Sequence, residues 1–398
     1  MPVYTAEWVL PMTGEPIHRG SISVEDGRIG GVDDRAPADA VDLGDVAILP
    51  ALVNAHTHLE LSYLRGRVPP TERFLDWIRT IMATRRQYPD ASDTRILDAA
   101  RAAIAEARAS GTGLFGDISN TLVTTRLLRD AAMPAQVFYE LLRFNASDPE
   151  SMTREARANA NAAAGNGNVR VSLAAHAPYS VSPALFAAIR ADLDAHAGEV
   201  TSVHLGESLE EIEFIKRGTG PWRALLEELG VWTDEWEPPG TSPVEYLEQL
   251  GFLDRRVLAV HGVQFDGDDL DRLRARNMTI VSCPRSNQHV GVGAPPLEAF
   301  YAMDVNVAFG TDSLASAPDL NLFSELAEAR RLAPRVPARA LLQSATRQGA
   351  SALGFEEEFG TIEPGKRAQL IAVRTPAGVD DVEEYLVRGI EPSAVRWL

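Results

Sequence analysis

Two histidines that are one residue apart follow an apolar run near the start of the chain. His56 and His58 come directly after the run at residues 46–53. If this run is a β-strand, its side chains alternate between two faces, so the two imidazoles point the same way. Such a pair makes half of a metal site, and neutral imidazole suits zinc, iron or nickel. Taken alone, the pair is equally consistent with a core histidine followed by a loop histidine.

Polar residues that follow later apolar runs complete the predicted site. A catalytic metal needs about three protein ligands and an open position for water, whose pKa it lowers toward neutrality. Glu207, three residues after His204, could carry a proton between that water and a substrate, and His261 could hydrogen-bond the attacking oxygen. Each residue alone also has an ordinary structural use. Together they predict His56, His58, His204 and Asp312 as metal ligands and Glu207, His261 and Asp312 as catalytic groups.

The lysines bear on how many metal ions this site holds. The chain has only Lys216 and Lys366, and neither follows a predicted strand. A two-metal site bridged by a modified lysine is therefore not expected. We predict one divalent metal ion per chain, with zinc as the first choice and iron as the alternative.

The elements that must position these groups follow a repeating pattern. Eight β-rich apolar runs alternate with stretches rich in Ala, Leu, Arg and Glu, which is typical of parallel βα units in an α/β fold. No Gly-x-Gly-x-x-Gly opens an early helix, so a (β/α)₈ TIM-like barrel is favoured over a dinucleotide-binding sheet. Five of the eight histidines follow predicted strands, on the barrel face that carries active sites. The runs lie near residues 46–53, 112–118, 135–142, 169–175, 200–205, 257–262, 278–283 and 305–310, and the expected helices include 93–110, 183–196, 209–216, 269–276 and 319–332.

Short β-rich segments occupy both ends of the chain. Residues 4–10 and 20–24 are separated by turn signals, and β-like segments return at 360–366, 370–373 and 394–398. Neither end is long enough for a core of its own. We therefore predict a small β-sandwich domain built from residues 1–48 and 361–398, beside a barrel of residues 49–360.

Composition and charge disfavour several classes of protein. The 398 residues fit one barrel-sized domain plus a smaller one. The net charge of −18 disfavours nucleic acid or an anionic membrane as the main partner, because both need a basic face. No run approaches about 18 apolar residues, and the first residues lack a signal-peptide pattern, so we expect a cytoplasmic protein. The one cysteine, Cys283, excludes an intrachain disulfide and is interpreted as a small apolar residue.

Five motifs in a fixed order carry a resemblance to a known family. They are His56-x-His58, His204-Leu-Gly-Glu207, His261-Gly262, Cys283-Pro-x-Ser286-Asn287 and Gly310-Thr-Asp312-Ser313. From about residue 20 to 390 the chain resembles the amidohydrolase superfamily, in its branch of single-metal purine and pyrimidine deaminases and related chlorohydrolases. The resemblance implies hydrolytic deamination, in which metal-activated hydroxide attacks an amidine-like ring carbon, Glu207 protonates the adjacent ring nitrogen and ammonia leaves.

Three further segments bear on the substrate. His176-Ala-Pro-Tyr179 resembles the segment that contacts the ribose in adenosine-type deaminases. Residues 54–62 and 74–78 resemble the aminodeoxyfutalosine deaminases of the alternative menaquinone pathway, whose nucleoside carries an aryl carboxylate on its 5′ side. The resemblance thus implies a small-molecule nucleoside substrate, with 6-amino-6-deoxyfutalosine as the best single choice.

A carboxylate on the substrate calls for a guanidinium group in the site. Arg143, after the third run, and Arg285 are the candidates, although either could form an ordinary ion pair instead. Trp77 could stack on the ligand from a lid or could belong to the core. The substrate-binding residues predicted in this way are His176, Arg143, Trp77, Glu60, Ser286 and Asn287.

Several alternatives remain open at this stage. Within the same chemistry, the substrate could be S-adenosylhomocysteine, methylthioadenosine or adenosine, or the enzyme could be a guanine deaminase or a triazine chlorohydrolase. Outside catalysis, the chain could be an inactive binding or scaffold paralogue, and a homodimer is a further expectation. No predicted ligand or catalytic position is missing, which favours an enzyme.

Overall fold

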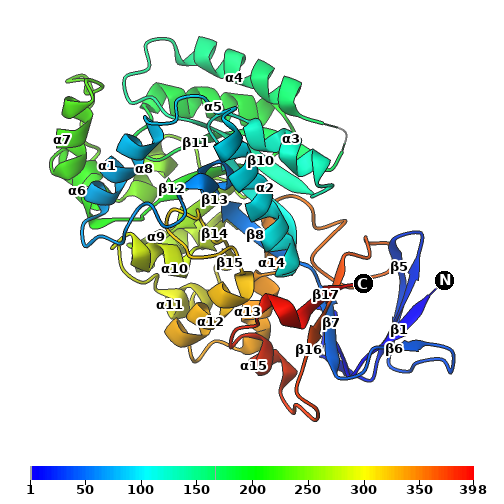
Figure 1. Ribbon diagram of the computed structural model, residues 1–398. Coiled ribbons are helices and arrows are strands. Elements are labelled where there is room, and N and C mark those ends of the chain that lie inside the picture. Colours follow the sequence, from blue (N-terminus) through cyan, green and yellow to red (C-terminus); the bar gives the residue numbers. More distant parts are fainter. Residues whose placement is uncertain (1, 166) are drawn as a thin grey trace.

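The computed structural model describes residues 2–165 and 167–398, and its centre is formed by eight parallel strands (Figure 1). They form two four-stranded sheets in the orders β11-β10-β9-β8 and β12-β13-β14-β15. Seven of these strands match a predicted run to within one residue at each end, and β8 starts within the end of the first run, which confirms an α/β fold with parallel strands. The bounds are β8 Leu52–Thr57, β9 Thr112–Ser119, β10 Ala135–Leu141, β11 Val169–Ala175, β12 Thr201–Leu205, β13 Val257–His261, β14 Thr279–Ser282 and β15 Asn306–Phe309.

The two sheets are linked near the carboxyl ends of their strands. A parallel bridge joins Thr57 to Asp312, and the N–H groups of Thr311 and Asp312 donate to the His56 carbonyl at 3.1 and 3.0 Å. At the opposite edges, the His204 N–H donates to the His176 carbonyl at 2.8 Å. These backbone contacts bring the residues that follow strands of both sheets to one region.

Helices follow most strands, and several of them start where a polar side chain caps the first turn. Asp93 accepts from the Arg95 N–H, so α2 begins at Thr94, as the sequence predicts. The last predicted helix starts three residues later than expected, because Asn321 caps its first turn. The main helices are α1 Phe74–Arg85, α2 Thr94–Ala109, α3 Val123–Asp130, α4 Pro149–Ala163, α5 Pro183–Ala195, α6 Leu209–Arg217, α7 Pro221–Glu228, α8 Pro243–Gln249, α9 Gly267–Ala275, α10 Pro284–His289, α11 Leu297–Ala302, α12 Leu322–Leu332, α13 Ala338–Ser344, α14 Arg347–Ala352 and α15 Val382–Leu386.

The first apolar run contains a break that the sequence analysis missed. It was expected to be one strand, but it forms β7 (Val46–Pro50) and the start of β8, which belong to different sheets. Between them, the Ala51 N–H donates to the Gln369 carbonyl, which redirects the chain from one sheet to the other. His56 therefore lies inside β8 and is fully buried, whereas His58 lies just beyond it.

The two chain ends meet in one mixed sheet. Its order is β17-β16-β7-β2-β3, which joins β16 (Leu370–Arg374) and β17 (Val395–Trp397) to N-terminal strands. The two ends of the chain lie on the same side of the molecule in Figure 1. Residues of this sheet share a hydrophobic cluster with the second terminal sheet, β5-β4-β1-β6. The remaining bounds are β1 Val3–Thr5, β2 Trp8–Val9, β3 Ile17–His18, β4 Ser21–Glu25, β5 Arg28–Asp33 and β6 Val41–Asp42.

One predicted β-like segment is not a strand. Residues 360–366 form turns, in which Gly365 adopts a φ of 89° after Pro364. Pro364 has no N–H to donate to a neighbouring strand, so the segment cannot extend a ladder here. Ile362 still contributes to the cluster between the terminal sheets, and its N–H donates to the Pro11 carbonyl. The β-like character of this segment therefore reflects the burial of Ile362 and not strand pairing.

Among the helices that the structure describes, none has both the length and the apolar character needed to cross a membrane.

Candidate active site

The four predicted metal ligands converge at the carboxyl ends of the strands. His58 Nε2 lies 3.4 Å from Asp312 Oδ1, and His56 Nε2 lies 3.9 Å from the same oxygen. The ring centres of His56 and His204 are 5.0 Å apart. His56 belongs to two groups whose ligand atoms are within metal-binding reach of one another, one with His58 and Asp312 and the other with His204 and His261.

The chemistry of these side chains fits a divalent metal ion. Nε2 of His56 and Nε2 of His204 are buried without a hydrogen-bond partner in the described part of the chain. Buried polar atoms of this kind are normally paired, so two of them on rings whose centres are 5.0 Å apart fit a bound metal ion. Burial lowers the pKa of His56 well below its usual value, and the neighbouring imidazoles add to this effect. Imidazole nitrogens beside one carboxylate form a donor set that suits zinc.

Asp312 is held by hydroxyl groups on the side away from the histidines. Ser286 Oγ donates to Asp312 Oδ2 at 2.5 Å, and Ser316 Oγ donates to the same oxygen at 3.2 Å. Asp312 also adopts a φ of 57°, which non-glycine residues rarely do and which the bridge to Thr57 maintains. Burial alone would raise the pKa of Asp312, but His58 and His261 outweigh it and keep the pKa below its usual value. Ser286 thus supports a ligand and does not itself line the cavity.

Glu207 and His261 face each other across the same space. His261 Nε2 lies 3.6 Å from Glu207 Oε1 and 3.0 Å from His204 Nδ1. Burial raises the pKa of Glu207 to about 8, with Asp312 adding to the effect and His204 opposing it. Burial also lowers the pKa of His261 to about 3, so this imidazole is neutral near pH 7. The pair therefore consists of a carboxyl group that is protonated near pH 7 and an uncharged imidazole ring that can form hydrogen bonds.

A second polar group borders the predicted ligands on the opposite side. Glu140 Oε1 lies 3.4 Å from His204 Nε2, and Asn120 Nδ2 donates to Glu140 Oε2 at 2.8 Å. His176 Nδ1 lies 2.6 Å from Ser180 Oγ, which fixes the orientation of its ring. Burial would raise the pKa of Glu140, but His176 and His204 hold it below its usual value. Glu140 was not among the site residues predicted from the sequence.

These groups line a cavity of about 120 Å³. Trp77 is buried and stacks on Phe74 with ring centres 6.2 Å apart, so it belongs to the core and also borders the cavity. Asn287 lies behind His261, with its Nδ2 3.0 Å from His261 Nδ1. The lining residues include His58, Trp77, Ile81, Arg85, Asn120, Glu140, Leu142, His176, Tyr179, His204, Glu207, His261 and Asp312.

The two arginines named from the sequence lie elsewhere. Arg143 is exposed and is not among the residues that line the cavity; its backbone forms a bridge with Val181. Arg285 is committed to ion pairs with Glu325 at 2.6 Å and Asp319 at 3.0 Å. Neither guanidinium group therefore reaches the cavity in this structure.

The arginine that does reach the cavity is Arg85, at the end of α1. Sequence analysis did not name it, because it looked for functional residues after strands. A signal was present, since Trp77, Ile81 and Arg85 are spaced four residues apart and share one helix face. Glu60 lies beside Arg85 and does not line this cavity. A substrate in this cavity would therefore not make the contact with Glu60 that the sequence predicted.

Comparisons with known proteins agree with this geometry. The amidohydrolase family matches residues 47–390. The 5-methylthioadenosine/S-adenosylhomocysteine deaminase of Moorella thermoacetica is 30% identical over 97% of this chain and 90% of its own length. The aminodeoxyfutalosine deaminase of Deinococcus radiodurans is 31% identical over 81% of this chain and 77% of its own. An adenosine deaminase from Xanthomonas campestris, solved with bound zinc, has a TM-score of 0.83 at 26% identity and covers 99% of this chain and 90% of its own. The chain therefore belongs to the amidohydrolase family.

Proposed function

We propose that this protein is a metal-dependent deaminase of adenine nucleosides. The observation that supports it most is the convergence of His58, His204 and Asp312 with Glu207 and His261 around one cavity, with the fully buried His56 within metal-binding reach of them. The relatives named above are deaminases of adenosine derivatives, and they match this chain over most of its length. Water replaces the amino group at C6 of the purine, so adenosine and water would give inosine and ammonia.

His56, His58, His204 and Asp312 would hold one divalent metal ion, zinc first and iron as the alternative. A metal bound there supplies Lewis-acid activation of the attacking water. Asp312, which His58 and His261 keep ionised, accepts a proton from that water and passes it to the departing amino group, which leaves as ammonia. Glu207, which keeps its proton to about pH 8, donates it to the ring nitrogen next to C6. His261 remains neutral and hydrogen-bonds the attacking oxygen.

The arrangement of strands supports a complete barrel around this site. We propose that the two four-stranded sheets close through the Thr57–Asp312 bridge and the hydrogen bond between His204 and His176. We also propose that the two terminal sheets pack as a β-sandwich, because Val9, Ile22 and Leu370 share one cluster. Closure would place both groups of metal ligands over one barrel mouth, where such enzymes carry their sites.

The finer proposal is that the substrate carries an aryl carboxylate on its 5′ side, with 6-amino-6-deoxyfutalosine as the best single choice and menaquinone synthesis as its pathway. It is supported by the relative from Deinococcus radiodurans. The second candidate is 5′-methylthioadenosine or S-adenosylhomocysteine, supported by the relative from Moorella thermoacetica, which covers more of this chain. In both cases the purine points toward His204 and Glu207, and the ribose lies toward His176.

Ammonia release from a panel of nucleosides tests this proposal. The zinc-loaded protein would be given adenosine, 5′-methylthioadenosine, S-adenosylhomocysteine and 6-amino-6-deoxyfutalosine, with guanine and a chlorinated triazine as controls. We expect release from the adenine nucleosides and the highest kcat/KM for 6-amino-6-deoxyfutalosine. Activity on guanine or the triazine alone would overturn the adenine nucleoside class.

A further inference from the structure

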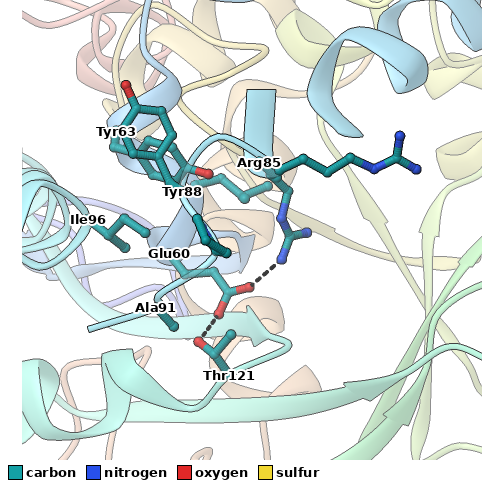
Figure 2. A pocket seen from close by; sticks show the side chains of 10 residues that line it. Glu60, Tyr63, Arg85, Tyr88, Ala91, Ile96 and Thr121 are labelled. Atoms are coloured by element: carbon teal, nitrogen blue, oxygen red, sulfur yellow. Dashed lines mark hydrogen bonds and ion pairs between the residues drawn. The ribbon is translucent and has the colours of Figure 1, made fainter. Parts of the chain in front are cut away.

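A second cavity lies next to the active site and is shown in Figure 2. It has a volume of about 330 Å³, against about 120 Å³ for the cavity around the predicted ligands. Figure 2 shows the Glu60 carboxylate joined to Arg85 and Thr121, with the rings of Tyr63 and Tyr88 close together beside them. We call this cavity the side pocket; it is lined by Glu60, Leu61, Tyr63, Arg85, Arg86, Tyr88, Pro89, Ala91, Ile96 and Thr121.

The side pocket adjoins the active site through two shared residues. Leu61 and Arg85 line both cavities, so the two cavities are neighbours that share these side chains as a common boundary. Asn120 accepts from Arg85 Nη1 at 3.2 Å and donates to Glu140, which lies beside His204. A single row of polar contacts therefore runs from the predicted metal ligands to the boundary of the side pocket.

The walls of the side pocket combine aromatic rings with positive charge. Tyr63 and Tyr88 meet edge to face at 5.3 Å between ring centres, and Ile96 adds an apolar surface. Arg85 and Arg86 bring two cations against the one carboxylate of Glu60. This local excess of positive charge stands out in a chain whose net charge is −18. Aromatic and apolar walls with a guanidinium group suit a flat ring that bears a carboxylate.

Glu60 positions Arg85 without using up its hydrogen-bonding capacity. The carboxylate of Glu60 already accepts from Ser119 Oγ at 2.9 Å, the Asn120 N–H at 3.1 Å and Thr121 Oγ1 at 2.7 Å. Its contact with Arg85 Nη2 is longer, at 3.4 Å. A guanidinium group has five N–H donors, so Arg85 retains donors for a further acceptor while Glu60 and Asn120 hold its plane in place.

We propose that Arg85 and the side pocket bind an aromatic carboxylate attached to the 5′ carbon of the nucleoside, so that Arg85 determines substrate specificity. This inference rests on the proposed deamination and specifies which nucleosides it favours. The purine and ribose occupy the smaller cavity, the 5′ substituent passes Leu61, and its ring lies against Tyr63 and Tyr88. The carboxylate pairs with Arg85, and Arg86 supplies a second positive charge.

The position of Arg143 makes it a matched control for this assignment. Arg143 is exposed and lines neither cavity, although its place after the third strand made it the candidate in the sequence. The two arginines can thus be compared by the same substitution to methionine, which keeps an unbranched apolar stem and removes the guanidinium group.

The test uses three adenine nucleosides that differ only at the 5′ substituent: one with a benzoate group, one with the matching benzamide, and plain adenosine. For the wild-type protein we expect the benzoate to have the highest kcat/KM. Arg85→Met should lower kcat/KM for the benzoate roughly 10- to 100-fold and leave the other two within about threefold, because a charge-assisted hydrogen bond is lost only with the carboxylate. Arg143→Met should leave all three unchanged.

Binding provides a readout that does not depend on turnover. Calorimetric titration of zinc-loaded Glu207→Gln protein, with and without Arg85→Met, measures the preference for benzoate over benzamide directly. Loss of that preference with Arg85→Met supports the inference, and Arg85→Lys, which keeps the charge, should restore part of it. An equal loss on all three nucleosides, an unchanged preference, or an effect confined to Arg143→Met would overturn it. Failure of every nucleoside to release ammonia while the binding preference persists would overturn the proposed deamination and not the assignment of Arg85.

Discussion

Glu211 accepts a hydrogen bond from the backbone N–H of Glu207 at 2.9 Å, so one buried carboxyl group holds the loop that presents another. Its other oxygen accepts from the N–H of Gly206 at 3.0 Å. Gly206 has a φ of 63°, and a Cβ there would meet the Phe265 ring at 2.4 Å, so the turn between His204 and Glu207 requires glycine. The spacing of the His-x-x-Glu motif is therefore fixed by contacts outside the cavity.

Replacing Glu211 by glutamine should lower kcat and change KM little. An amide would put an N–H group against one of the two backbone donors, and the position of Glu207 would become less defined. We expect kcat to fall roughly tenfold, the effect of losing about one charge-assisted hydrogen bond. Steady-state kinetics measures this, with Glu210→Gln on the same helix as the control. Equal effects of both substitutions would contradict the role given to Glu211.

Replacing Glu207 by glutamine should abolish most turnover while metal binding persists. The amide keeps the shape of the side chain but cannot deliver the proton, and general acid–base catalysis contributes roughly 10²–10⁴-fold. Measuring kcat together with the metal content of the purified variant checks both parts. A variant with near-normal turnover would show that Glu207 does not move the proton.

Replacing His204 by alanine should greatly weaken metal affinity. His204 Nε2 is one of the buried nitrogens without a partner, and its loss leaves three of the four predicted ligands. Elemental analysis should find one zinc or iron ion per wild-type chain and much less in His204→Ala after dialysis against a weak chelator. Two tightly bound ions in active wild-type protein would contradict the single-metal site.

Because Asp117 is buried, the free energy of unfolding should fall as pH rises. Burial raises its pKa to about 8, although hydrogen bonds from Thr124 and the Leu59 N–H oppose this. In the unfolded chain it ionises near pH 4, so between about pH 4 and pH 8 the folded state binds the additional proton and loses stability with increasing pH. Asp117→Asn can keep both contacts and has no proton to lose. Urea unfolding of metal-free protein from about pH 5 to pH 8 should show a steeper decline for the wild type than for the variant. Parallel declines would contradict a raised pKa.

The strands and the predicted site residues differ in how far the sequence could determine them. Apolar runs located all eight parallel strands, because burial on both faces leaves a continuous hydrophobic signal. His56, His58, His204, Glu207, His261 and Asp312 were found because they follow or end those strands, and the structure brings them together. A search for polar residues that follow strands contains no information about residues on a helix such as α1.

Arg85 illustrates this limit. It ends α1, a helix that the sequence analysis did not predict, and its approach to the cavity depends on contacts with Glu60 and Asn120 from separate segments. Arg143, which satisfied the strand-end rule, turned outward instead. The change of sheet at Ala51 was missed for a similar reason, because the apolar pattern continues unbroken through it. Side-chain direction after a strand is decided by packing that no local pattern encodes.

The bridge between Thr57 and Asp312 joins positions 255 residues apart; Thr57 lies between two predicted metal ligands, and Asp312 is itself a third. During synthesis the first two histidines leave the ribosome long before their carboxylate partner does. The complete set of predicted ligands therefore exists only after Asp312 has been made and has met β8. A nascent chain that ends before Asp312 offers a metal ion only an incomplete set of the predicted donors, so we expect tight binding only once this bridge has formed. In a cell, a metal ion would then bind tightly only to molecules in which Thr57 and Asp312 have already met, and it would stabilise those molecules.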